Sequence, residues 1–253
     1  MAIFDTPLIL VLTLLITLGA GIVKGAIGFA MPLIMVSLIG SIVEPKLALA
    51  GIVIPIVFSN LYQSFRTGYK EASTVVQVHW RYIIITCLFI FLSAQLVPSI
   101  PNKMFYLVLG VPVLLLTIIQ LMGVNMHIKP VHQNASEWIV GTISGMLGGL
   151  AGTWGPTTVL YLLAINTPKA RQVVVQGVIY GLGAITLLFG HIKSGILNTD
   201  TVVFSFILLF PALLGMWLGF KIQSLLSQAQ FRKITLIVLL IAGCNLIRLG
   251  LVY

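Results

Sequence analysis

The sequence predicts an all-α integral membrane protein, a polytopic helical bundle built from two inverted repeats. Three observations indicate this fold: the low charge, the long uncharged apolar segments, and one glycine and proline spacing that occurs twice. Of the 253 residues, 59% are hydrophobic and only 8% are charged, whereas an ordinary globular domain is about 25% charged. The chain therefore has the composition of a protein that lies within a bilayer.

Six full-length helical spans are predicted from uncharged runs, since about 20 apolar residues cross a bilayer as a helix. They cover residues 47–65, 80–98, 104–123, 173–191, 201–220 and 234–252. Two further apolar regions, 6–43 and 138–166, contain several glycines and a proline, and we expect each to form a broken, re-entrant-like helix pair. Counting each pair once gives about eight transmembrane segments, within a range of roughly seven to ten.

The repeated spacing has intervals of four, three and four residues, and its two copies are 124 residues apart. The first copy is Gly21, Gly25, Gly28 and Pro32, and the second is Gly145, Gly149, Gly152 and Pro156. Glycine and proline both disfavour a helix interior. Interrupted hydrophobic segments at matching places in two halves indicate the binding site of a transporter.

The predicted division is repeat 1 over residues 1–126, a polar inter-repeat loop over 127–137, and repeat 2 over 138–253. An odd number of crossings in each half inverts the second half. Basic residues then fall nine to four on the two sides, so we expect the richer side to be cytoplasmic and both termini periplasmic. The nine are Arg66, Lys70, Arg81, Lys129, Lys169, Arg171, Lys221, Arg232 and Lys233; the four are Lys46, Lys103, Lys193 and Arg248.

A binding site for an anion is expected near the bilayer midplane, between residues 24–29 and 149–154. A broken helix exposes backbone N–H groups and about half a positive charge at each N-terminus, and glycine lets a ligand approach them. The candidate binding residues are Lys24, Gly25, Gly28, Phe29, Asn60, Gly149, Gly152, Thr153, Trp154 and Gln176, with Pro32 and Pro156 marking the breaks.

Each candidate also has a structural interpretation. The glycines fit close helix packing, and the amides of Asn60 and Gln176 fit bonds between helices. Lys24 is either a buried cation at the site or a water-exposed residue at the end of a complete span.

Other classes of function are disfavoured. The charges sit singly between apolar spans, which argues against nucleic-acid binding, and no carboxylate falls well inside a span, which argues against a cation transporter. We find no nucleophile–base set, no metal-ligand spacing and no phosphate-binding loop, so we expect no enzyme activity, metal or cofactor. Cys87 and Cys244 fall in spans and are expected to pack as apolar groups.

The segments GAGIVKGAIGFAMPLIMVSLIG (19–40) and GTISGMLGGLAGTWGPTTVLYLLAINTPKAR (141–171) resemble the two signature segments of the TauE/SafE sulfite-exporter family. The resemblance extends over nearly the whole chain. It implies a secondary transporter, an exporter by expectation, in the bacterial inner membrane that carries sulfite or organosulfonates such as sulfoacetate. An anion channel of the same architecture and a carrier of another small organic anion are the alternatives. A homodimer stays open, because a lipid-facing stripe and a dimer face look alike in sequence.

Overall fold

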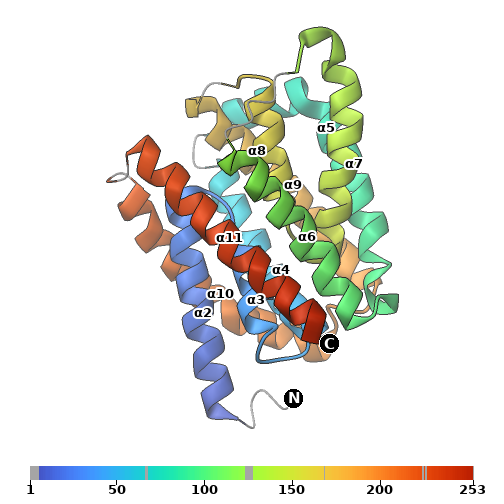
Figure 1. Cartoon of the computed structure of the whole chain (residues 1–253), viewed down its shortest axis with the longest axis vertical. Coiled ribbons are helices and arrows are strands. Elements are labelled where there is room, and N and C mark those ends of the chain that lie inside the picture. Colours follow the sequence, from blue (N-terminus) through green and yellow to red (C-terminus); the bar gives the residue numbers. More distant parts are fainter. Residues whose placement is uncertain are drawn as a thin grey trace.

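The computed structural model describes residues 6–65, 68–122, 128–167, 169–223, 225 and 227–252. Within these ranges the chain forms helices joined by turns and short loops, without strands (Figure 1). The prediction of an all-α protein is therefore confirmed. Of the predicted cytoplasmic residues, Arg66 and the side chains of Lys169 and Arg232 lie outside the described part.

Ten α-helices account for most of the described residues. They are α2 (Pro7–Ile27), α3 (Met31–Ile39), α4 (Pro45–Phe65), α5 (Tyr69–Ala94), α6 (Asn102–Leu121), α7 (Gln133–Ala151), α8 (Gly155–Ala164), α9 (Lys169–Lys193), α10 (Thr199–Gln223) and α11 (Gln228–Val252). Two single 3₁₀ turns, η1 (Val97–Ser99) and η2 (Pro130–His132), precede α6 and α7.

Six of the described helical segments are long and apolar enough to cross a membrane. They are Pro7–Ile27, Pro45–Phe65, Tyr69–Ser99, Asn102–Ile119, Val174–Lys193 and Thr199–Gln223. The protein is thus a multi-pass membrane protein. Of these six segments, those of α4 and α9 are the most buried, whereas α2 and α10 expose large apolar side chains such as Leu15 and Phe210, as expected for helices that face lipid.

Helices α5 and α7 are two of the helices that begin earlier than the apolar pattern predicts. α5 begins at Tyr69, eleven residues before the expected span 80–98, and bends at His79, whose φ of −109° and ψ of 20° are not helical. α7 begins at Gln133, five residues before the region 138–166. Polar residues end a membrane span but not a helix, so both helices continue past the apolar segment.

The first helix break follows α2. Gly28 has a φ of 85°, in the left-handed region, and its N–H donates to the carbonyl of Lys24 at 2.7 Å. A left-handed glycine directly after the last turn is the usual end of an α-helix. After two more residues α3 begins, with Pro32 in its first turn, where the absent N–H of proline costs nothing.

The second break repeats these features after α7. Gly152 has a φ of 65°, and its N–H donates to the carbonyl of Gly148 at 2.6 Å. α8 then begins at Gly155 and has Pro156 in its first turn. The two short helices α3 and α8 therefore start from equivalent turns.

Glycine stripes on α2 and α7 bring these helices close to neighbours from the other half of the chain. α2 packs along α10, and α7 packs along α5 (Figure 1). A Cβ added at Gly25 would lie 2.8 Å from the Cα of Gly219, and a Cβ at Gly149 would lie 2.8 Å from the backbone N of Ala94. Real side chains do not tolerate such distances to backbone, so these contacts require glycine.

Candidate functional site

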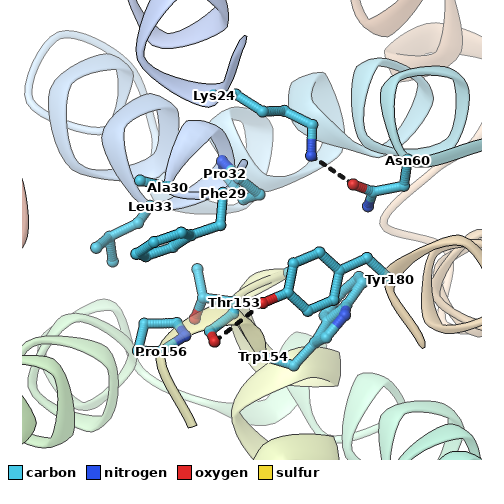
Figure 2. Close-up of a pocket in the computed structure, with 12 residues that line it drawn as sticks. Lys24, Phe29, Ala30, Pro32, Leu33, Asn60, Thr153, Trp154, Pro156 and Tyr180 are labelled. Atoms are coloured by element: carbon cyan, nitrogen blue, oxygen red, sulfur yellow. Dashed lines mark hydrogen bonds between the residues drawn. The ribbon is translucent and has the colours of Figure 1, made fainter. Parts of the chain in front are cut away.

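A small cavity lies between the two helix breaks, where α3 and α8 begin (Figure 2). Its volume is about 30 Å³, which is enough for about two water molecules. The lining residues are Lys24, Phe29, Ala30, Pro32, Leu33, Asn60, Gly152, Thr153, Trp154, Gly155, Pro156 and Tyr180. In Figure 2, side chains from the first break and from the second face each other across this space.

Lys24 supplies the positive charge of the cavity. It lies in the last turn of α2, where the helix C-terminus favours a cation, and it is only 2% exposed. Its Nζ donates a hydrogen bond to Oδ1 of Asn60 on α4 (Figure 2). Among the described residues, the salt bridge joins Arg81 to Glu137, so no carboxylate pairs with Lys24. A buried cation without an acidic partner is costly, and it marks a place where an anion is favourable.

The first turns of α3 and α8 add further donors. Pro32 and Leu33 line the cavity from α3, and Gly155 and Pro156 line it from α8. N–H groups in a first helical turn have no acceptor within the helix, and each helix N-terminus carries about half a positive charge. Two such ends that meet at one cavity favour an anion between them.

Trp154 contributes a donor that has no acceptor in the described part of the chain. The residue is 2% exposed, and its Nε1 is buried without a hydrogen-bond partner there. The indole packs against Gly148 and Gly183, where an added Cβ would lie 3.0 and 3.1 Å from ring carbons. Tyr180 stands edge-on to the indole, with ring centroids 6.3 Å apart, and donates its hydroxyl to the carbonyl of Gly155 at 3.1 Å.

Hydroxyl groups hold the second break in place. Thr157 and Thr158 donate to the carbonyl of Trp154 at 3.0 and 2.8 Å. Ser144 of α7 donates to Thr157 at 2.5 Å, and the hydroxyl of Tyr82 on α5 lies 2.7 Å from that of Ser144. The turn that carries Trp154 is thereby fixed to both α7 and α5.

Most of the residues predicted from sequence meet at the cavity. They are Lys24, Phe29, Pro32, Asn60, Gly152, Thr153, Trp154 and Pro156. Gly25 and Gly149 lie elsewhere, at the contacts with α10 and α5. Gly28 and Gln176 lie beside one another: a Cβ at Gly28 would be 3.5 Å from Oε1 of Gln176.

Four lining residues were not among the predicted site residues: Ala30, Leu33, Gly155 and Tyr180. The signals that could have found them are simple. Ala30, Leu33 and Gly155 flank the break prolines, and Tyr180 lies one helical turn after Gln176, so both side chains share a face of α9.

The lining is thus rich in hydrogen-bond donors and apolar surface, with one cation. Such a lining can bind a small anion. Within the part of the chain that the structure describes, no group of three or more His, Cys, Asp and Glu residues is placed to hold a metal ion.

Comparison with known proteins gives one family. The family model described as sulfite exporter TauE/SafE matches residues 13–246, a range that contains every residue of the cavity lining. No curated protein and no solved structure matches the chain.

Proposed function

The chain belongs to the sulfite exporter TauE/SafE family of membrane transporters, and we propose that the cavity between its helix breaks is the site at which it carries a small sulfur oxyanion. The observation that carries this proposal is Lys24, whose buried ammonium group faces the cavity. No carboxylate among the described residues forms a salt bridge with it. The unused N–H of Trp154 and the starts of α3 and α8 complete a set of donors for anion oxygens.

The size of the cavity favours a compact anion. Space for about two water molecules suits sulfite, which has four heavy atoms. An organosulfonate such as sulfoacetate is larger, so it requires the cavity to open. We therefore place sulfite first among the substrates, with organosulfonates as cargo of a more open conformation.

Two inverted repeats are supported by contacts that recur across the chain. A Cβ at Gly21 of α2 would lie 3.1 Å from the backbone N of Met216 on α10, and a Cβ at Gly145 of α7 would lie 3.2 Å from the backbone N of Ile90 on α5. Gly21 and Gly145 are 124 positions apart, and Ile90 and Met216 are 126 apart. Such reciprocal contacts support a two-fold axis between a first repeat within 1–126 and a second within 138–253, each with a broken pair and three full helices.

Transport then follows by alternating access, in which one repeat moves against the other around the midplane cavity. The nine-to-four bias of basic residues supports an orientation with both termini in the periplasm of a bacterial inner membrane. An interior-negative potential favours outward movement of an anion by about 2.3 kcal/mol per charge for each 100 mV, so export needs no coupling ion. The cavity is lined by one chain, and the proposal requires no second copy.

Sulfite flux in proteoliposomes tests the proposal. Lys24→Met should abolish saturable flux, a loss of about a hundredfold or more, because it removes the charge that the anion pairs with. Lys46→Met is the matched control, since Lys46 is half-buried outside the cavity lining and its Nζ donates to the carbonyl of Pro98 at 2.9 Å. Unchanged flux in Lys24→Met would reject the site.

The alternatives are separated in the same vesicles. A channel gives conductance without saturable counterflow, whereas a carrier gives counterflow. Competition by thiosulfate, sulfoacetate, taurine, sulfate and small carboxylates identifies the preferred anion. Strong competition by carboxylates alone would favour a carrier of another organic anion.

A further inference from the structure

Three glutamine side chains form a cluster beside the cavity, which we call the amide cluster: Gln63 on α4, and Gln172 and Gln176 on α9. Gln63 and Gln176 are 5% and 7% exposed. Their tips reach Gly28 together, since a Cβ at Gly28 would lie 3.5 Å from Oε1 of Gln176 and 3.7 Å from Nε2 of Gln63. The cluster thus adjoins the first helix break without lining the cavity.

The amides continue in a line away from the cavity. On α9, Tyr180, Gln176 and Gln172 are spaced by four residues, so they share one face and follow each other at intervals of about 6 Å. On α4, Gln63 comes three residues after Asn60, which Figure 2 shows at the cavity with Tyr180. The line leads toward the end of the bundle where α4 ends and α9 begins, and where Arg171 is exposed.

Two of the three amide nitrogens in this cluster have no acceptor among the described residues. Nε2 of Gln63 and Nε2 of Gln172 are both buried without a hydrogen-bond partner there. An unsatisfied buried donor costs about 1–3 kcal/mol, and it calls for an explanation. Amides that serve to join helices form bonds, as Gln95 does with the carbonyls of Phe91 and Gly190 at 3.0 and 3.1 Å.

The second break shows that packing alone does not require these amides. A Cβ at Gly152 would meet Cδ1 of Ile52 at 3.0 Å and Cδ2 of Leu187 at 3.5 Å. Ile52 is 124 positions before Gln176, and Leu187 is 124 positions after Gln63. The same two places around the glycine cap therefore hold hydrocarbon at one break and amides at the other.

We propose that the amide cluster is an outer anion site, which holds the sulfur oxyanion on its way between the cavity and the Arg171 end of α9. The inference rests on the function proposed for the cavity. The free N–H groups of Gln63 and Gln172 donate to oxygens of the anion. Neutral amides bind an anion more weakly than the Lys24 ammonium does, and a weak site on a transport route lets the ion enter and leave.

The test uses the full-length chain in right-side-out and inside-out membrane vesicles, with sodium sulfite added to the outer solution. Gln63→Leu and Gln172→Leu should each raise the KM for sulfite about tenfold when it is presented on the side that carries Arg171. From the other side the KM should stay within about twofold. Gln77→Leu, at an exposed position of α5, is the matched control and should transport like the wild type from both sides.

A thermal unfolding measurement separates loss of an anion site from loss of the fold. Leucine removes an unsatisfied donor, so both variants should unfold at the wild-type temperature or above it. Gln63→Glu and Gln172→Glu keep the side-chain volume and place an acceptor where the anion binds. They should lower sulfite flux from the Arg171 side more than the leucine variants do. They also replace the leucine variants in this test if those do not fold.

Wild-type KM values from both sides in these variants would overturn the outer site while leaving the cavity intact. Equal losses from both sides would also overturn it, because they would place the amides at the cavity itself. Failure of the cavity is recognised separately: Lys24→Met keeps its flux, or the wild type shows no saturable sulfite flux, and then both proposals fall.

Discussion

The two helix breaks have the same backbone and different chemistry. Gly28 and Gly152 both end their helices in the left-handed region, with cap hydrogen bonds of 2.7 and 2.6 Å. Four residues before each cap, however, stand Lys24 in one and Gly148 in the other. The first break provides a charge, and the second provides space that the Trp154 indole fills. The glycine and proline spacing therefore sets the backbone shape of the two breaks, while residues between those positions set the chemistry of the cavity lining.

The largest expected effect comes from the glycines that lie away from the cavity. Gly25→Leu and Gly149→Leu place a side chain against the backbone of a neighbouring helix, because the new Cβ would lie 2.8 Å from the Cα of Gly219 or from the backbone N of Ala94. We expect neither variant to yield stable, monodisperse protein on size-exclusion chromatography, since overpacking against backbone costs about 3 kcal/mol or more.

Gly19→Leu is the matched control, because nothing lies within 4 Å of a Cβ at that exposed position. It should elute like the wild type. If Gly25→Leu and Gly149→Leu also fold normally, these glycines do not serve packing, and they return as candidate ligand contacts.

The next largest effect concerns Asn60, the acceptor of the Lys24 ammonium. Asn60→Leu leaves the buried charge without its partner and should destabilise the protein by about 3 kcal/mol. Sulfite should restore part of this loss in a thermal unfolding assay, since an anion replaces the missing acceptor.

The double variant Lys24→Met/Asn60→Leu removes both polar groups. It should unfold at a higher temperature than Asn60→Leu alone, because replacing both partners by apolar groups removes the unpaired charge. It should also lose its response to sulfite. If the double variant were less stable than Asn60→Leu alone, the Lys24 ammonium would not be destabilised by the loss of its Asn60 acceptor.

A smaller effect distinguishes the two caps directly. Alanine at either glycine is strained by the positive φ, at about 1–2 kcal/mol. At Gly152 the new Cβ also meets Cδ1 of Ile56 at 2.9 Å, whereas at Gly28 the nearest atom is 3.5 Å away. Gly152→Ala should therefore lower the unfolding temperature more than Gly28→Ala, and adding Ile56→Val should recover part of the difference. Equal losses would mean that the two caps are equally open.

The smallest effect is expected at Ala30, which has a φ of 75° although it carries a Cβ. Ala30→Gly relieves about 1–2 kcal/mol of left-handed strain and loses about 0.4–1 kcal/mol through the more flexible unfolded chain. The net change should be a slight rise in unfolding temperature. Ala20→Gly, in the interior of α2, should lower it, because glycine is unfavourable in a helix. If Ala30→Gly lowered the unfolding temperature as much as Ala20→Gly, Ala30 would not be strained by its positive φ.

The two helix breaks can be predicted from the sequence because glycine and proline disfavour a helix through their own backbone geometry. The turns at 28–30 and 152–154 fall within the expected intervals 24–29 and 149–154 to within one residue. Only the packed structure distinguishes a glycine that faces another helix, such as Gly149, from one that lines a cavity, such as Gly152. Neither position has room for a side chain, so glycine occurs at both and the sequence alone does not separate the two roles.

The position of Lys24 was open for a similar reason. A lysine after an apolar run fits both the end of a span and a buried site, and the choice depends on where the helix ends. Because α2 continues to Ile27, Lys24 lies inside the helix and within reach of Asn60. Tyr180 can be predicted from its helix face, which it shares with Gln176, but its hydrogen bond to Gly155 at the second break is tertiary information.

The pairing of α2 with α10 has a consequence for biosynthesis. The main partner of α2 is synthesised roughly 190 residues later, which at about 5–20 residues per second is a delay of roughly 10–40 seconds. During that time the glycine stripe of α2 lacks the helix against which it packs. Nascent chains cut before α10 should therefore be unstable in the membrane, because quality-control proteases can reach α2 before α10 packs against it.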